Sequence, residues 1–118
     1  MSGLTFNVKT ALNSAEIKAD LEATTKQVQA PLDALILQDS NFFCPIKTGA
    51  LQKSAITNSR IGSGELVWRT PYARRLYYEY EKPAHQANPN ACSKWFEAAK
   101  ARWLDKWARF VNDRIKRS

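Results

Sequence analysis

The sequence has little of what most enzyme and metal sites are built from. It holds one histidine and two cysteines in 118 residues, and Cys44, His85 and Cys92 show no Cys-x-x-Cys spacing. A site of several histidines is therefore excluded, and neither a zinc site nor a cysteine–histidine nucleophile is indicated. Residues 62–64 have no Gly-Lys-Ser/Thr after them, which excludes a P-loop. We expect no catalytic residue, no metal and no cofactor, and hence a protein that is not an enzyme.

The sequence also lacks a long hydrophobic run. No stretch approaches the roughly eighteen apolar residues of a membrane-spanning helix. Residues 1–9 show no charged start followed by an apolar block, which argues against a signal peptide. We therefore expect the chain to stay in the cytoplasm where it is made, with both cysteines reduced and buried. The length of 118 residues predicts a single domain over residues 1–118.

Charge is plentiful but unevenly placed, and the net charge is +7. Residues 1–41 hold three basic and five acidic side chains, residues 42–93 hold seven and three, and residues 94–118 hold eight and three. An acidic front and a basic back suggest an electronegative partner or head-to-tail contact between copies. The alternative is a solvated basic helix face, because net charge speaks to association and not to fold.

Alternating apolar and polar residues predict three strands. Residues 4–9 alternate with their apolar members inward, namely Leu4, Phe6 and Val8. Residues 54–61 are β-branched and polar, residues 62–64 form a glycine-rich turn, and residues 65–70 alternate again. We predict that residues 54–61 and 65–70 form a hairpin.

Helical spacing of apolar residues predicts a long helix near each end of the chain. The first begins near Ser14 and ends near Gln38, with a kink at Pro31 because proline removes a main-chain donor. The last runs from about residue 91 or 93 to Arg117 and carries a broad aromatic stripe. The members of the stripe are Trp95, Phe96, Ala99, Trp103, Trp107, Phe110 and Val111.

These elements predict an α+β fold. Two long helices, the N-terminal one kinked and the C-terminal one amphipathic, pack on a small, mostly antiparallel sheet. Between the first helix and the hairpin, Phe42 and Phe43 stand in a segment that we expect to be extended. Their side chains then point to opposite sides, so that one can face a partner.

Two short motifs lie between the long helices. Residues 48–54 read Thr-Gly-Ala-Leu-Gln-Lys-Ser, a short helical start with Thr48 as a suitable N-cap and Gly49 allowing a close backbone approach. Residues 71–78 read Pro-Tyr-Ala-Arg-Arg-Leu-Tyr-Tyr, which places several tyrosines within about two helical turns. At least two of these rings must therefore stack on one another or on a neighbour.

This order of motifs resembles the small neck and minor capsid proteins of long-tailed bacteriophages. Those proteins carry a Thr-Gly-Ala-Leu segment, a β-hairpin, a Pro-Tyr-Ala segment with following tyrosines, and a Trp-Phe helix. The resemblance covers roughly residues 38–105. It implies that a set of motif residues anchors the structure, with no catalytic role: Thr48, Gly49, Ala50, Leu51, Pro71, Tyr72 and Ala73. The sequence departs from the family at Lys47, where members often carry an acidic residue.

The resemblance implies a structural protein of the virion. Several copies, six or twelve in this family, form a homo-oligomeric ring in the neck that joins the DNA-filled head to the tail. The expected partners are other connector and tail proteins and the DNA passing through the channel, with no membrane. The ring assembles in the host cytoplasm. Head-closure, neck and tail-terminating roles stay open.

Ring symmetry requires that one face of a copy meets a different face of the next. We expect the acidic first helix to meet the basic last helix of a neighbour. The predicted interface residues are Arg74, Arg75, Tyr77, Tyr78, Arg102, Lys106 and Arg109. Arg74 and Arg75 reach either the neighbour's carboxylates or DNA in the channel.

Two other functions remain open from the sequence. Arg69, Arg74 and Arg75 stand beside tyrosines, as in a single-strand nucleic-acid platform, so a small basic nucleic-acid-binding domain is the main alternative. A toxin-like or regulatory protein is the other. The four tryptophans exceed what one small core needs. We expect one or two of Trp95, Trp103 and Trp107 to fill the groove between the long helices and the others to be exposed at an interface.

Overall fold

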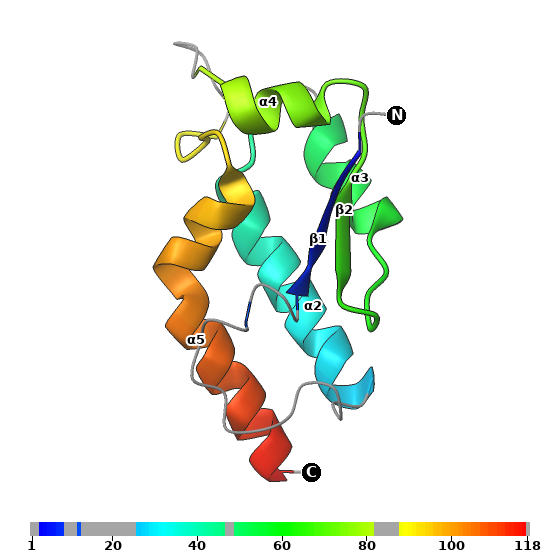
Figure 1. Cartoon of the computed structure of the whole chain (residues 1–118), viewed down its shortest axis with the longest axis vertical. Coiled ribbons are helices and arrows are strands. Elements are labelled where there is room, and N and C mark those ends of the chain that lie inside the picture. Colours follow the sequence, from blue (N-terminus) through cyan, green and yellow to red (C-terminus); the bar gives the residue numbers. More distant parts are fainter. Residues whose placement is uncertain (1–2, 9–11, 13–25, 47–48, 82–87, 118) are drawn as a thin grey trace.

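The fold consists of a two-stranded sheet set against helices, as the computed structural model shows (Figure 1). It describes residues 3–8, 12, 26–46, 49–81 and 88–117. In chain order the elements are β1 (Leu4–Asn7), α2 (Lys26–Asn41), α3 (Ala50–Asn58), β2 (Glu65–Trp68), α4 (Ala73–Glu79) and α5 (Trp95–Arg117). The predicted α+β class is confirmed.

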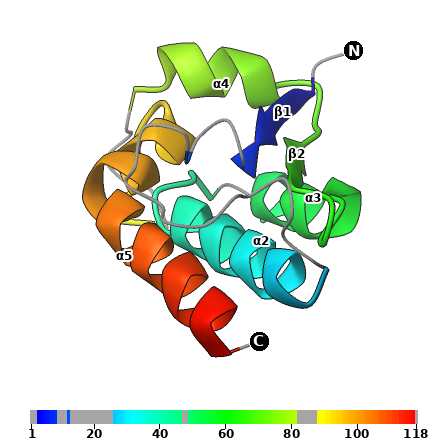
Figure 2. The ribbon, with the colours of Figure 1, turned by 60° about the horizontal axis from the view of Figure 1, so that its bottom comes forward.

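Helix α2 occupies the centre of this arrangement. In both views α5 lies on one side of α2 and α3 on the other (Figures 1 and 2). Helices α2 and α5 lie side by side and run in opposite directions, while α4 crosses near one end of the sheet. The outer sides of α5, α4 and α3 are therefore three separate surfaces.

The sheet joins the start of the chain to its middle. β1 and β2 are antiparallel, with Leu4 opposite Trp68 and Phe6 opposite Leu66. The predicted inward direction of the apolar residues of β1 is confirmed, because Leu4 and Val8 are buried and Phe6 stacks on Phe96 of α5 with ring centroids 4.4 Å apart.

The predicted hairpin between residues 54–61 and 65–70 is wrong. Residues 50–58 form α3 instead, and the partner of β2 is β1. A buried stripe at helical spacing, Leu51, Ser54 and Ala55, explains the helix, because packing of this stripe outweighs the β-branched residues beside it. One isolated bridge, between Arg60 and Glu65, is all that pairs the two segments.

The predicted helical start after Thr48 is confirmed as α3, but its cap differs. Gly49 is the N-cap, with a left-handed φ of 86° that an L side chain rarely adopts. Thr48 itself lies outside the described residues.

The first long helix is described only in its second half. α2 ends at Asn41, a few residues beyond the predicted end, and it contains Pro31. Its predicted start near Ser14, with the Asn13–Glu16 cap, lies outside the described residues. The kink at Pro31 stays a prediction.

The segment after α2 is a turn, which corrects the expected extended conformation. The amides of Phe42, Phe43 and Cys44 donate to the carbonyls of Gln38 and Asp39, of Ser40 and of Asn41. Phe42 and Phe43 therefore do not point apart. Both rings lie against Trp103 of α5, with centroids 5.4 and 5.6 Å from it.

Aromatic side chains dominate the core. Trp68, Trp95 and Trp107 are each 0% exposed, and Tyr77 is 1% exposed. Trp103 is half-buried. The expectation that one or two of the α5 tryptophans are buried is met by Trp95 and Trp107, whereas the remaining one, Trp103, is only partly exposed. Among the predicted stripe residues of α5, Phe96, Ala99 and Val111 are also buried.

Candidate interaction surfaces

Clusters of potential metal ligands are absent from the described part of the chain. No three histidine, cysteine or acidic side chains gather there as metal ligands, and His85 lies outside that part. None of the described helices is long and apolar enough to cross a membrane. Neither Cys44, which is buried, nor Cys92, which is half-buried, forms a disulfide.

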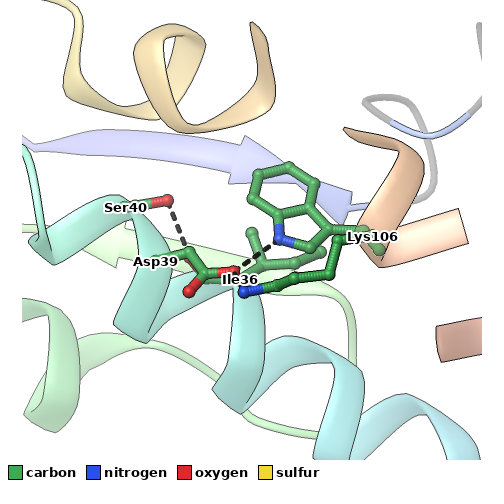
Figure 3. A network of polar contacts seen from close by, with 5 residues as sticks. Ile36, Asp39, Ser40 and Lys106 are labelled. Atoms are coloured by element: carbon green, nitrogen blue, oxygen red, sulfur yellow. Dashed lines mark hydrogen bonds and ion pairs between the residues drawn. The ribbon is translucent and has the colours of Figure 1, made fainter. Parts of the chain in front are cut away.

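A buried carboxylate at the end of α2 fixes the position of α5. Asp39 Oδ2 accepts a hydrogen bond from Trp107 Nε1 at 2.8 Å and lies 2.9 Å from Lys106 Nζ (Figure 3). Next to it, Ser40 Oγ donates to the Ile36 carbonyl at 2.7 Å. Lys106, predicted at an oligomer interface, thus makes an ion pair inside its own chain, although its side chain is 41% exposed.

A second carboxylate of α2 shapes the turn before β2. Asp33 is 0% exposed, and its Oδ2 accepts the main-chain amides of Gly62 and Gly64, both at 2.8 Å. Its Oδ1 accepts Gln29 Nε2 at 2.6 Å. These bonds satisfy a buried acid and orient the turn. Nothing in the sequence separates Asp33 and Asp39 from surface acids except their helical spacing with the apolar stripe.

The predicted acidic front is reduced by these contacts. Asp33 and Asp39 are buried and bonded within their own chain, so their carboxylates are not available to a neighbouring copy. The remaining acids of residues 1–41, Glu16, Asp20 and Glu22, lie outside the described residues.

An aromatic and basic surface lies where the turn after α2 meets α5. We call it the Phe42–Trp103 surface, made of Phe42, Phe43, Arg102, Trp103 and Lys106. Phe42 is 41% exposed and meets Phe43 edge-on at 5.0 Å. The Arg102 guanidinium lies 5.2 Å from the Trp103 ring and 5.9 Å from the Phe42 ring, and Lys106 Nζ lies 4.9 Å from Trp103. Such contacts hold the cations over the ring faces.

Side-chain amides hold the turn beneath this surface. Gln52 Nε2 donates to the carbonyls of Asn41 and Cys44, each at 2.9 Å. Asn88 Nδ2 donates to the carbonyls of Phe42 and Cys44, at 2.9 and 2.8 Å. The exposed Phe42 is therefore fixed in place before any partner arrives, which lowers the entropy cost of binding.

The rest of the outer side of α5 carries both signs of charge. Arg109 and Asp113 line a hollow with Lys106, Phe110 and Asn112, and the Arg114 guanidinium lies 4.9 Å from the Phe110 ring. A second hollow contains two acids, Glu97 and Asp105, beside Lys100 and Arg102. Partial burial raises the pKa of Glu97, an effect that nearby Lys100 opposes. The last helix is thus more mixed in charge than its composition suggests.

A separate basic face lies on α4. Arg74 and Arg75 are exposed, and Tyr78 is 58% exposed on the same side of the helix. Arg69, just after β2, is also exposed. None of these three arginines pairs with an acid among the described residues. We call Arg69, Arg74, Arg75 and Tyr78 the α4 arginine face.

The tyrosines of the second motif divide between core and surface. Tyr77 and Tyr78 meet edge-on with centroids 5.2 Å apart, as expected for neighbouring rings. The predicted contact of Tyr77 with a neighbour does not fit its position, because it is 1% exposed and packs on Phe6 and Trp95. Tyr72 is half-buried against the core, and Ala73 is buried.

Comparison with known families identifies the chain. The model of the minor capsid protein family matches residues 7–114, nearly the whole sequence. The chain belongs to the minor capsid protein family of phages. This minor capsid protein is therefore a phage structural protein of the virion, and membership indicates a structural role instead of an enzymatic one. No curated protein and no solved structure matches it.

Proposed function

We propose that this minor capsid protein forms an oligomeric ring in the neck of the virion, between the DNA-filled head and the tail. The observation that carries the proposal is the Phe42–Trp103 surface. It combines an exposed, pre-fixed aromatic ring with an exposed arginine, and these residue types dominate binding hot spots. Six or twelve copies are expected from the resemblance to neck proteins.

In this proposal the contact between copies is head-to-tail. Arg102 and Arg109 on α5 of one copy meet the acidic residues near the start of the next, Glu16, Asp20 and Glu22. Lys106 contributes less, because its charge is already matched by Asp39. Two different faces meeting in this way generate a closed ring when the rotation between successive copies closes on itself.

The α4 arginine face has a different task in the proposal. It lies on another element from the Phe42–Trp103 surface, and its arginines have no acidic partner among the described residues. We place it toward the channel, where Arg74 and Arg75 contact DNA phosphates. The same face supports the second candidate, a free-standing nucleic-acid-binding domain, through its exposed Tyr78.

The location is tested on particles. Virions are purified through a high-salt wash and labelled with antibody and gold against this chain. Gold at the head–tail junction is the expected result. Gold elsewhere on the particle, or no protein left after the wash, removes the neck proposal.

The ring contact is tested by charge. Arg102→Glu with Arg109→Glu should block assembly of the ring while the monomer keeps its near-ultraviolet circular dichroism. The matched control is Lys53→Glu with Arg60→Glu, which gives the same change of charge at two exposed residues in and just after α3. Helices α3 and α5 lie on opposite sides of α2 (Figure 2). Equal assembly of both double variants contradicts the proposed contact.

A further inference from the structure

The two cysteines lie on neighbouring segments of the fold, although they are far apart in the sequence. The Cys92 main-chain amide donates to the Phe43 carbonyl at 3.0 Å. Asn88 Nδ2, on the same segment as Cys92, donates to the carbonyls of Phe42 and Cys44 at 2.9 and 2.8 Å. The segment that leads into α5 is therefore held along the turn that follows α2.

The spacing of the two main chains suits a disulfide. The Phe43 carbonyl belongs to the peptide bond that precedes Cys44, and it accepts the amide of Cys92 itself. Standard peptide dimensions therefore keep the Cα atoms of Cys44 and Cys92 within about 7 Å of one another. Disulfides join Cα atoms that are usually about 4.4–6.8 Å apart. Little movement of the main chain is needed to bring the pair to bonding distance.

The two thiols also lie close to one another. Burial is the main cause that raises the pKa of the Cys44 thiol, and the Cys92 thiol raises it further. A second ionisable group has this effect only from a short distance, so the side chains do not point apart. Cys44 is buried, whereas Cys92 is half-buried and therefore in contact with solvent.

We propose that Cys44 and Cys92 are a redox switch: they form a disulfide within one chain when the protein meets a low-molecular-weight disulfide, and they return to thiols in a reducing medium. The chain belongs to a family of virion proteins. Thiols are kept reduced inside cells, whereas disulfides persist outside them. The reduced pair is thus the form in which the chain is made, and the bond forms after the virion leaves its host.

The reaction begins at Cys92, which is the more exposed thiol. Its thiolate attacks one sulfur of the small disulfide, which breaks that S–S bond, forms a mixed disulfide at Cys92 and releases one small thiolate. The Cys44 thiol then gives up its proton, and its sulfur attacks the Cys92 sulfur. This step forms the Cys44–Cys92 bond and releases the second small thiolate. The two cysteine protons end on the two released thiolates, and two electrons pass from the cysteines to the small disulfide.

The bond lies beneath the Phe42–Trp103 surface. It ties the turn that carries Phe42 and Phe43 to the segment before α5, which the side chain of Asn88 already holds there. It also closes the long loop between the two cysteines, which restricts the unfolded chain and so stabilises the fold. The switch does not depend on where the protein lies in the virion.

The test is an equilibrium in glutathione buffers. The purified full chain is incubated with reduced and oxidised glutathione at several ratios, quenched with acid, and analysed by intact mass and peptide mapping. We expect a monomer that has lost two hydrogen atoms and yields a pair of peptides linked through Cys44 and Cys92. The equilibrium constant for this bond should be at least about tenfold larger for the folded chain than in concentrated urea, because the fold holds the thiols close together.

Thermal unfolding gives a second measurement. Oxidation should raise the melting temperature of the natural chain by roughly 10 °C, and dithiothreitol should reverse the rise. Cys92→Ser is the matched control, because it keeps the buried Cys44 and replaces only the half-buried thiol by a group of similar size. This variant should form no internal bond and should show the same melting temperature in both buffers.

Three results overturn the inference. In one, the folded chain carries glutathione on Cys92 but forms no internal bond. In another, the internal bond forms no more readily in the folded chain than in urea. The third is a disulfide between two chains instead of within one. The labelling of particles with gold is a separate measurement, so the neck proposal can fail while the switch stands.

Discussion

At the scale of single residues, two aspartates that the sequence does not distinguish from surface acids hold parts of the fold together. Asp39 binds Trp107 and Lys106, and Asp33 binds two amides of the turn before β2. A buried donor that loses its acceptor keeps the full cost of desolvation. The hydrogen bond from Trp107 should therefore contribute more to the free energy of unfolding than the partly exposed ion pair between Asp39 and Lys106.

Asp39→Ala should lower the free energy of unfolding by about 2–3 kcal/mol, because Trp107 Nε1 is left buried without an acceptor. Lys106→Met should lower it by less than about 1 kcal/mol, because half-exposed ion pairs contribute little. Urea denaturation of both variants measures the difference. Equal losses would mean that the ion pair, and not the indole bond, holds α5 on α2.

Cys44 should make stability depend on alkaline pH. Burial raises the pKa of its thiol, and the nearby Cys92 raises it further, whereas a hydrogen bond with Trp68 opposes the shift. In the unfolded chain the thiol ionises near its ordinary pKa of 9.0, so the folded chain binds more protons above that pH. The contribution is complete below about pH 9 and is lost as the pH rises.

The measurement is the urea midpoint of unfolding between about pH 8 and 10.5, for the natural chain and Cys44→Ala. The natural chain should lose up to about 1.4 kcal/mol more per pH unit at the alkaline end. The alanine variant starts less stable because of the cavity but should show the flatter profile. Parallel profiles contradict the assignment to Cys44.

At the scale of elements, α3 acts as the border of the sheet. It supplies the hydroxyl of Ser54, and the residue after it supplies that of Ser59, so the outward amides of β2 are bonded without a third strand. A two-stranded sheet is marginal alone and depends on such support.

Ser59→Ala should cost about 1–2 kcal/mol of unfolding free energy, because the partly buried Val67 amide loses its acceptor. Ser63→Ala is the control, since Ser63 is exposed and its bond to the Glu65 amide is long, at 3.3 Å. It should cost less than about 0.5 kcal/mol. Chemical denaturation distinguishes them, and a larger loss for Ser63→Ala would contradict this account of the edge.

Periodicity in the sequence predicted the elements whose own residues carry the signal. The aromatic stripe of α5 and the alternation of β1 are visible without knowledge of any neighbour. Residues 54–61 were predicted as a strand because β-branched residues favour strands. The helix over residues 50–58 forms instead through burial of Leu51, Ser54 and Ala55. The partner of β2 was also missed, because its pairing with the distant strand β1 gives no signal in the local sequence.

At the scale of the whole molecule, the charge of each surface depends on which charged side chains are buried or paired within the chain. Composition predicted a basic back, but it could not tell that Lys106 is paired with Asp39 or that Tyr77 is buried. The amide contacts of Gln52 and Asn88 that fix Phe42 were also missed, because they join residues far apart in the chain. Burial and pairing are tertiary properties.

The α4 arginine face should affect DNA binding without affecting assembly. Arg74→Ala with Arg75→Ala should reduce the slope of log affinity against log salt by about 1–2, roughly one for each lost phosphate contact. Ring formation should be unchanged. Fluorescence anisotropy with labelled duplex DNA at several salt concentrations gives the slope. If this double variant assembles poorly and keeps its salt slope, the face belongs to an interface between subunits.

During synthesis on the ribosome, elements that contact one another in this fold are made far apart in time. β1 is synthesised before its partner β2, with the described helices α2 and α3 between them, and Asp39 lies 68 positions before Trp107. Until then the nascent chain carries an unpaired strand and a helix whose acids have no partners. Domains with such distant contacts fold slowly. A chain truncated before α5 should therefore stay unfolded, so that folding has to wait until α5 has been synthesised.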